Sequence, residues 1–110
     1  MAELGTITLK GQSGTEYKFN VYKWDTDFDD IGAVYYISNR HKDDDGGWKH
    51  TKIYIGQTGD LSDHFDNHHK SECFEDHDVN AVSVHRDDDE DSRLVKEIDL
   101  IMVLNPPCNG

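Results

Sequence analysis

Two stretches of alternating hydrophobic and polar residues open the chain and predict a β-hairpin. Residues 6–10 and 17–21 each alternate with a period of two, which is typical of a strand that buries one face. Between them, residues 11–14 contain two glycines, a composition that favours a tight turn. Residues 24–30 are polar and acidic and are expected to form a linker to the rest of the chain.

Further strands are predicted in the middle of the chain. Residues 33–38 are nearly all apolar or aromatic, as expected for a central strand that is covered on both faces. Shorter strands are expected at residues 52–56 and 79–85. The stretch at residues 39–51 holds three consecutive aspartates followed by two glycines and has no clear periodicity. We therefore expect it to be a solvated loop.

A long helix is predicted near the C-terminus, at residues 92–104, and Pro106 would end it. The acidic run at residues 87–91 directly precedes this helix and would stabilise its N-terminal end. Another helix is expected at residues 60–70, and a short one near residues 73–74. The long helix is expected to bury its regularly spaced apolar residues, Leu94, Val95, Ile98, Ile101 and Met102.

These elements predict one small domain of the α/β (α+β) class. The 110 residues suit a single core, and we expect a mixed, mainly antiparallel sheet flanked by helices. Residues 1–30 would form an N-terminal hairpin and linker, and residues 32–109 the core. No stretch approaches the roughly 18 apolar residues that a membrane span needs, and the N-terminus lacks the pattern of a signal peptide. We therefore expect a cytoplasmic protein with no membrane partner.

The net charge of −12 changes this picture, because nucleic-acid binders commonly have the opposite sign. Acidity of this magnitude favours solubility and repels polyanions at long range. Two explanations remain open. One is adaptation to a salty cytoplasm, and the other is an acidic surface that meets a basic protein partner.

Two tyrosine motifs lie in the predicted strands and precede a helical carboxylate. The first is Ala33-Val34-Tyr35, continued by Tyr36-Ile37, and the second is Tyr54-Ile55-Gly56. Glu97 lies in the long helix, ahead of a Pro–Asn tail at residues 106–109. This combination resembles the GIY-YIG nuclease superfamily over roughly residues 32–109, with Ala33 in place of the first glycine. The resemblance implies a DNA endonuclease that depends on a divalent metal ion.

The resemblance also implies roles for individual residues. Glu97 would bind one Mg²⁺ or Mn²⁺ ion, because a carboxylate is a hard ligand that leaves several waters on the ion. That ion would neutralise the phosphate and stabilise the leaving oxygen. Tyr35 and Tyr54 would direct their hydroxyls at the attacking water and the phosphate. One of them could act as general base if its pKa fell well below about 10.

One position departs from the family pattern. Members carry an arginine in the helix after the second motif, where this chain has His64. The arginine grips the scissile phosphate with a permanent charge and a planar fork, whereas a histidine of pKa near about 6.5 is mostly neutral at pH 7. Losing one such donor costs about 10²–10³ in rate. His68, four residues on, would be a second catalytic contact, and Arg40 could supply the missing phosphate contact.

Two other interpretations stay open. A binding module for nucleic acid or a basic protein could keep the fold and lose the chemistry. Tyr35 and Tyr54 would then be core residues, and Glu97 an ordinary helix carboxylate.

A zinc site is the less favoured interpretation. His64 with His68, and Cys73 with His77, are spaced i, i+4, but the spacing matches no zinc signature. Two cysteines are too few for a disulfide framework, so Cys73 and Cys108 are both expected to be reduced thiols.

Overall fold

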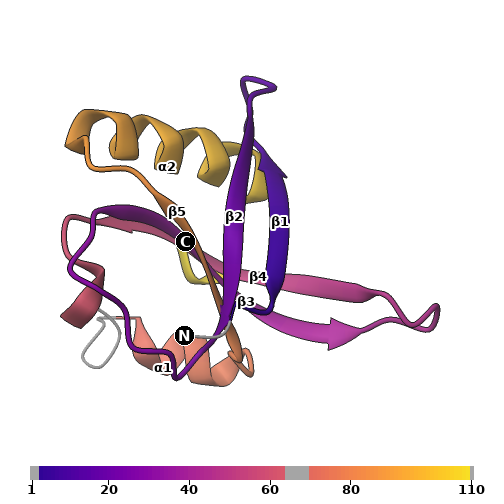
Figure 1. Ribbon diagram of the computed structural model, residues 1–110. Helices are drawn as coiled ribbons and strands as arrows, with labels where there is room; N and C mark the ends of the chain where they lie inside the picture. Colours follow the sequence, from indigo (N-terminus) through magenta and orange to yellow (C-terminus); the bar gives the residue numbers. More distant parts are fainter. Residues whose placement is uncertain (1–2, 64–69, 110) are drawn as a thin grey trace.

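The computed structural model describes residues 3–63 and 70–109 (Figure 1). Within these residues, five strands form one sheet, and two α-helices and two short 3-10 helices (η) accompany it. This architecture confirms the α+β class expected from the sequence. The strands are β1 (Gly5–Lys10), β2 (Glu16–Lys23), β3 (Ala33–Lys42), β4 (Trp48–Thr58) and β5 (Ala81–Arg86). The helices are η1 (Leu61–Asp63), α1 (Ser71–Asp76), α2 (Glu90–Leu104) and η2 (Pro107–Asn109).

The sheet has the strand order β1-β2-β5-β3-β4, so β5 lies between two hairpins. β5 pairs with β2 on one side and with β3 on the other. All the pairings among the described strands are antiparallel, so the parallel component of a mixed sheet is not found there. The alternating pattern of residues 6–10 and 17–21 correctly predicted the hairpin of β1 and β2, which extends the sheet.

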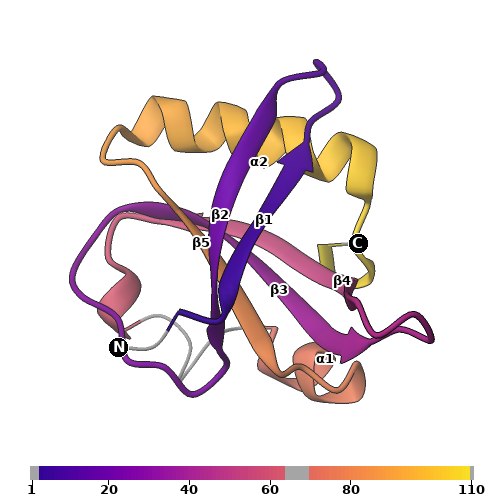
Figure 2. The same cartoon turned by 45° about the vertical axis from the view of Figure 1, so that its right-hand side comes forward.

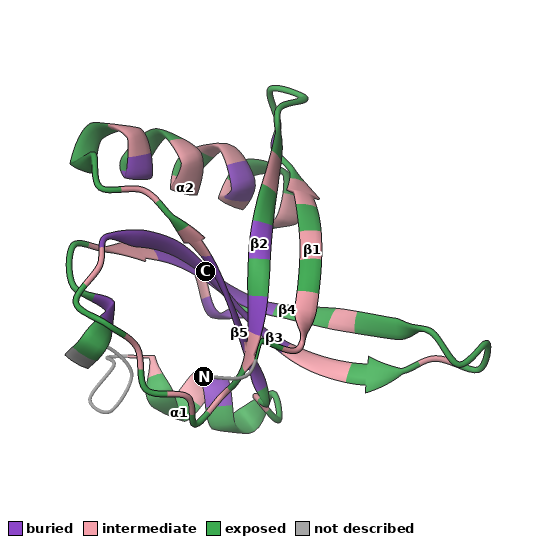
Figure 3. Ribbon diagram, in the orientation of Figure 1, coloured by how far each residue is buried: buried purple, intermediate pink, exposed green. Residues whose placement is uncertain are grey.

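Each face of the sheet is covered by one α-helix. Figures 1 and 2 show α2 along one face and α1 against the other. Burial is concentrated in β3 and β5, the strands at the centre (Figure 3). The α2 side of the core consists of Phe19, Val34, Tyr36, Ile55 and Leu100. The α1 side includes Tyr35, Ile37, Tyr54, Leu61, Phe74, Val82 and Cys108.

The long helix turns a different face inward from the one that its apolar residues predict. Arg93 and Leu100 are buried, and Glu97 between them is half-buried. These residues follow the spacing i, i+4, i+7 of one helix face. Of the predicted stripe, only Ile101 packs against the core. The prediction is wrong for Leu94 (38% exposed), Val95 (65%), Ile98 (55%) and Met102 (64%). The hydrogen bonds of Arg93 to Gln57 and to the carbonyl of Asp87, described below, account for this rotation of the helix.

Residues 39–51, expected to be a loop, instead complete a β-hairpin arm. β3 continues to Lys42 and β4 begins at Trp48, with a tight turn at residues 43–47. Figure 1 shows the arm projecting from the body of the domain. Its side chains are mostly exposed. A strand without a covered face has no reason to alternate hydrophobic and polar residues, which is why the pattern was missed.

The helix predicted at residues 60–70 is only partly within the described residues. η1 forms a 3-10 turn at its start and buries Leu61, and residues 64–69 lie outside the described ranges. α1 confirms the short helix expected near residues 73–74. In the described parts of the chain, no helix is long and apolar enough to cross a lipid bilayer.

Candidate functional site

Tyr35 and Tyr54 lie on the adjacent antiparallel strands β3 and β4. Their ring centroids are 6.1 Å apart. Tyr35 is paired across the strands with Gly56, and a Cβ atom there would lie 2.4 Å from both Cζ and Oη of Tyr35. The glycine of the second motif therefore provides the space in which the tyrosine of the first motif lies over β4.

The two tyrosine hydroxyls are hydrogen-bonded to each other in a nearly dry environment. Tyr35 is 1% exposed and Tyr54 is 9% exposed. Burial raises the pKa of Tyr35, and the charges of Tyr54 and Glu97 and the bond to Tyr54 raise it further. Burial and the charge of Glu97 also raise the pKa of Tyr54, whereas the bond with Tyr35 lowers it. Tyr54 is therefore the more accessible of the two tyrosines. The hydroxyl of Tyr35 stabilises the deprotonated form of Tyr54.

Glu97, on α2, is the carboxylate whose charge acts on this pair. Its carboxylate is half-buried, and burial raises its pKa. Its charge raises the pKa values of both tyrosines, so the three side chains lie within electrostatic reach of one another. Among residues 3–63 and 70–109, no hydrogen bond or ion pair to Glu97 is formed. The charge of Glu97 on α2 thus acts on the tyrosine pair, which lies on the α1 side of the core, and no described group holds the carboxylate by a hydrogen bond.

Arg93 is a charged residue at this site to which the sequence alone assigned no role. It is 7% exposed, and its Nε donates to the side-chain oxygen of Gln57 on β4 at 3.0 Å. Its Nη1 donates to the carbonyl of Asp87 at 3.1 Å. A Cβ atom at Gly32 would lie 2.6 Å from Nη1, and one at Gly59 would lie 3.5 Å from Nη2. Gly32, just before β3, therefore makes room for the guanidinium, whereas a Cβ atom at Gly59 would be in ordinary van der Waals contact with it.

Arg93 and Glu97 are four residues apart, so both lie on the face of α2 that meets the sheet. No described carboxylate lies within ion-pair distance of Arg93. A buried cation without a paired anion is costly, and such groups are often functional. The i, i+4 spacing from Glu97 was the sequence signal that could have identified Arg93.

The histidines predicted to act at the site, His64 and His68, lie outside the described residues. The prediction that they contact the phosphate therefore stays a prediction.

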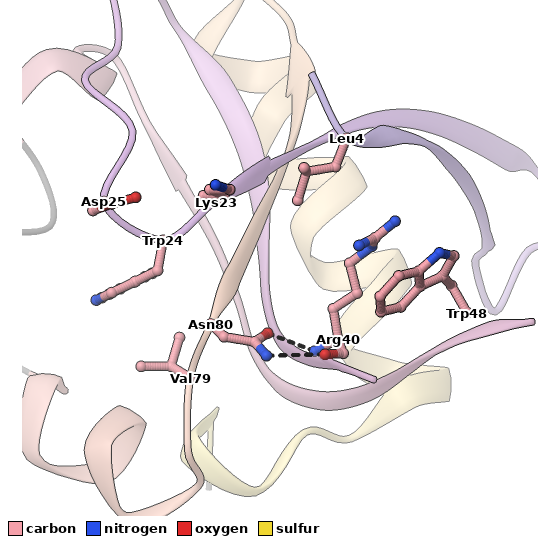
Figure 4. A pocket seen from close by; sticks show the side chains of 8 residues that line it. All are labelled: Leu4, Lys23, Trp24, Asp25, Arg40, Trp48, Val79 and Asn80. Carbon is pink, nitrogen blue, oxygen red and sulfur yellow. Dashed lines mark hydrogen bonds between the residues drawn. The ribbon is translucent and has the colours of Figure 1, made fainter. Parts of the chain in front are cut away.

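Arg40 is placed away from the tyrosine pair. It lies five residues beyond Tyr35 on β3, or roughly 16 Å at the rise of a strand. Its guanidinium stacks on Trp48, 3.7 Å from the ring centroid. The amide of Asn80 holds the Arg40 backbone with two hydrogen bonds, of 2.6 and 2.9 Å. Figure 4 shows these residues lining a pocket of about 490 Å³, with Trp24 on its other side.

The cysteines form a disulfide between Cys73 of α1 and Cys108 of η2. The expectation of two reduced thiols is wrong here, because η2 packs on β4 and brings Cys108 to Cys73 of α1, a residue 35 positions earlier in sequence. His77 lies beside both sulfur atoms, and the three side chains form a group that could hold a metal ion. Its sulfur and imidazole ligands are softer than those that Mg²⁺ prefers, so this group is distinct from the ion expected at Glu97.

Asn109 fixes the C-terminal tail to the second tyrosine motif. Its side-chain oxygen accepts from the backbone N–H of Ile55 at 2.8 Å, and its amide donates to the carbonyl of Ile55 at 2.8 Å. Asn109 thus holds the tail to an edge strand of the sheet. Through them the tail supports the residue between Tyr54 and Gly56.

Comparison with known proteins finds no matching family model, no matching curated protein and no matching solved structure.

Proposed function

We propose that the chain is a DNA endonuclease of the GIY-YIG type that depends on a divalent metal ion. The observation that carries this proposal is the state of Glu97. It is a half-buried carboxylate without a partner among the described residues, and its charge reaches both tyrosine hydroxyls. Partial burial of an unpaired carboxylate lowers stability, and a protein that retains one is expected to use it.

The donor set suits a hard cation such as Mg²⁺ or Mn²⁺. Glu97 would offer carboxylate oxygens and Tyr54 a hydroxyl oxygen, and neither carries sulfur or imidazole. Sites of this kind often use one or two carboxylates together with the substrate phosphate and several waters. When bound, the ion would neutralise charge on the phosphate and polarise it toward attack.

The tyrosines are proposed to have unequal roles. Tyr54 would hold the attacking water and accept its proton, because it is the more exposed of the two. Tyr35 would orient Tyr54 through their hydrogen bond, which lowers the pKa of Tyr54 and so acts in the direction that a proton acceptor requires.

Arg93 is proposed to supply the permanent positive charge that His64 lacks. Its fork is already oriented by Gln57 and by the carbonyl of Asp87. Its Nη2 makes no hydrogen bond to any described residue and remains able to donate to a phosphate oxygen. A guanidinium held in this way binds phosphate with little loss of side-chain entropy.

A plasmid-nicking assay with and without Mg²⁺ tests the proposal. We expect Mg²⁺-dependent nicking by the unmodified protein and a loss of at least about 100-fold in Glu97→Gln and in Arg93→Met. Tyr54→Phe is expected to lose activity to a similar extent. His64→Arg, which restores the arginine of the family pattern, is expected to increase the rate.

Glu90→Gln is the matched control, since it removes an exposed carboxylate from the first turn of the same helix. Burial disfavours the charged form of Glu97, so Glu97→Gln should be at least as stable as the unmodified protein at neutral pH. Loss of activity in that variant would therefore not reflect unfolding. A folded protein that stays inert with Mg²⁺ or Mn²⁺, in both the unmodified form and His64→Arg, would contradict the proposal.

The arm of β3 and β4 favours a second candidate function, nucleic-acid binding without cleavage. Arg40, Lys42, Lys49 and Lys52 lie on it, in a chain with 11 basic residues and a net charge of −12. Trp48 is 51% exposed, with Arg40 stacked on it and Nζ of Lys42 5.4 Å from its centroid. Exposed aromatic rings beside fixed cations are typical of surfaces that stack single-stranded bases.

This candidate is tested by titrating a single-stranded oligonucleotide against Trp48→Ala. Loss of one stacked base is expected to weaken binding about 10–100-fold. Lys10→Ala, on β1 at the opposite edge of the sheet, is the control. Binding that is unchanged in Trp48→Ala would exclude the arm as the contact surface.

A further inference from the structure

The disulfide and its neighbouring histidine have a geometry that a disulfide alone does not require. Nδ1 of His77 lies 3.9 Å from Sγ of Cys73 and 3.7 Å from Sγ of Cys108. His77 is the residue that follows the last turn of α1 and caps it. The three ligand atoms all lie within 4.8 Å of one another. An imidazole nitrogen is therefore placed at nearly equal distances from both sulfur atoms.

These distances are close to those between the ligands of a tetrahedral zinc ion. With Zn–S near 2.3 Å and Zn–N near 2.0–2.1 Å, a tetrahedral angle separates sulfur and nitrogen by about 3.6 Å. Both observed separations are near that value, so His77 already lies where a zinc ligand would lie. The two sulfur atoms would need to move apart, which reduction of the bond between them permits.

We propose that Cys73, His77 and Cys108 bind one Zn²⁺ ion when the disulfide is reduced. In the reduction, a small dithiol or another thiol reductant supplies two electrons and two protons. The Sγ–Sγ bond breaks, two thiols form, and the reductant becomes a disulfide. On zinc binding, both thiols release their protons to solvent and two thiolates coordinate the ion with Nδ1 of His77.

The chemistry of the three ligands selects the ion. Two thiolates and one imidazole are the soft to intermediate ligands that Zn²⁺ takes in proteins, and they disfavour Mg²⁺. The fourth position would be filled by water or by another side chain. Nδ1 of His77 lies 2.9 Å from the carbonyl oxygen of Cys73, and the ion would replace this interaction.

Access to the site is from the side of α1. Cys108 is 2% exposed, whereas Cys73 is partly exposed and His77 is exposed. A reductant or a metal ion can thus reach Cys73 and His77 first, while Cys108 presents its sulfur from the core. This arrangement keeps α1 connected to η2 in both redox states, by a disulfide or by zinc.

Titration of the full chain with Zn²⁺ and with Co²⁺, before and after reduction by a phosphine, tests the proposal. The reduced protein is expected to bind one equivalent, with the near-ultraviolet charge-transfer absorption of a cobalt thiolate. The oxidised protein should bind at least 100-fold more weakly. His77→Ala should weaken binding by the reduced protein at least tenfold, and His41→Ala, an exposed histidine on the arm, should not.

The double variant Cys73→Ser with Cys108→Ser keeps every histidine and separates this site from any other. Stoichiometric zinc in that variant, or equal binding before and after reduction, would overturn the proposal. So would a reduced, folded protein that binds no zinc. Because the redox comparison uses the unmodified sequence, the test holds even if the double variant does not fold.

Discussion

Gly56 decides where the first motif's tyrosine can lie. The ring of Tyr35 occupies the space above this glycine, and Cε2 of Tyr54 would lie 2.8 Å from an added Cβ atom. Tyr35 and the neighbouring strand residues are fully buried, so neither ring can move away without disturbing the core. The packing of the two tyrosine rings thus requires a glycine at position 56, which explains physically why the second motif ends in glycine.

We expect Gly56→Ala to lower the free energy of unfolding by about 1–3 kcal/mol, the usual cost of an overpacked core, and to separate the two hydroxyls. Urea denaturation measures the first effect. The ultraviolet titration of tyrosine measures the second, because the pKa values of the pair depend in part on their mutual bond. Gly47→Ala is the control, as nothing lies within 4 Å of a Cβ atom there. Equal stability of the two variants would contradict this account of Gly56.

The helix α2 shows how polar contacts can override an apolar pattern. A helix that buried its most hydrophobic face would turn Leu94 and Ile98 toward the sheet. Here Arg93 meets Gln57 and the carbonyl of Asp87, and the rotation that allows this leaves the two apolar residues exposed. Local rules are most often broken where a protein uses its residues for function. The rotation therefore supports a role for the inward polar face.

The N-terminal end of α2 depends on the acidic run that precedes it. Asp89 caps the helix by accepting from the N–H of Ser92 at 3.0 Å. Asp87 accepts from the hydroxyl of Ser92 at 2.5 Å and pairs with Lys96 at 2.8 Å. The bonds from Lys96, Ser92 and the Asp89 backbone, in that order of effect, hold the pKa of Asp87 well below its usual range. The run thus joins the helix start to its second turn.

We expect Asp87→Asn to lower the free energy of unfolding at pH 7 by about 1 kcal/mol, the scale of a lost charged hydrogen bond near the surface. The folded-state pKa of Asp87 is depressed, so its contribution is present above the ordinary aspartate value of about 3.9 and is lost as pH falls below it. The difference between the two proteins should therefore be constant above about pH 5 and shrink in acid. Denaturation curves at several pH values measure it.

Asp88→Asn serves as the comparison, because the Asp88 carboxylate is 75% exposed and its pair with Arg86 is long, at 3.7 Å. A surface pair of this kind contributes little. Equal losses of stability in the two variants would show that the Asp87–Lys96 ion pair does not cause the effect of Asp87→Asn. An effect of Asp87→Asn that persisted unchanged in acid would show the same.

Much of this fold could be predicted from the sequence, and the features that could not be predicted share a physical cause. The period-two alternation of β1 and β2, and the apolar run of β3, report local burial and predicted those strands. The placement of Tyr35 and Tyr54 in strands and of Glu97 in a helix was also predicted, and their roles stay predictions. The disulfide and the arm could not be predicted, because each depends on contacts between distant segments that leave no periodic pattern. Arg93 was missed although its spacing of four residues from Glu97 is a helical pattern. His64 and His68 cannot be compared, since they lie outside the described residues.

The net charge of −12 affects the stability of the whole molecule. With 23 acidic and 11 basic residues, mutual repulsion opposes the compact state at low ionic strength. We expect the melting temperature to rise with KCl, because the Debye length falls from about 30 Å at 0.01 M to about 3 Å at 1 M. Differential scanning calorimetry over that range measures the effect. A flat or falling curve would instead favour an acidic surface that binds a basic partner.

The position of β5 between the two hairpins has a consequence for how the chain folds. Each hairpin can form early from neighbouring residues, since its strands are joined by short turns. Neither can join the other until residues 81–86 arrive, because β5 is the strand that pairs with both. During synthesis, one edge of β2 therefore stays unpaired until about 60 further residues have been made. Strand pairings between residues so far apart in sequence form slowly. We expect the rate-limiting step of refolding to be the docking of β5, so Val82→Ala should slow folding more than it speeds unfolding.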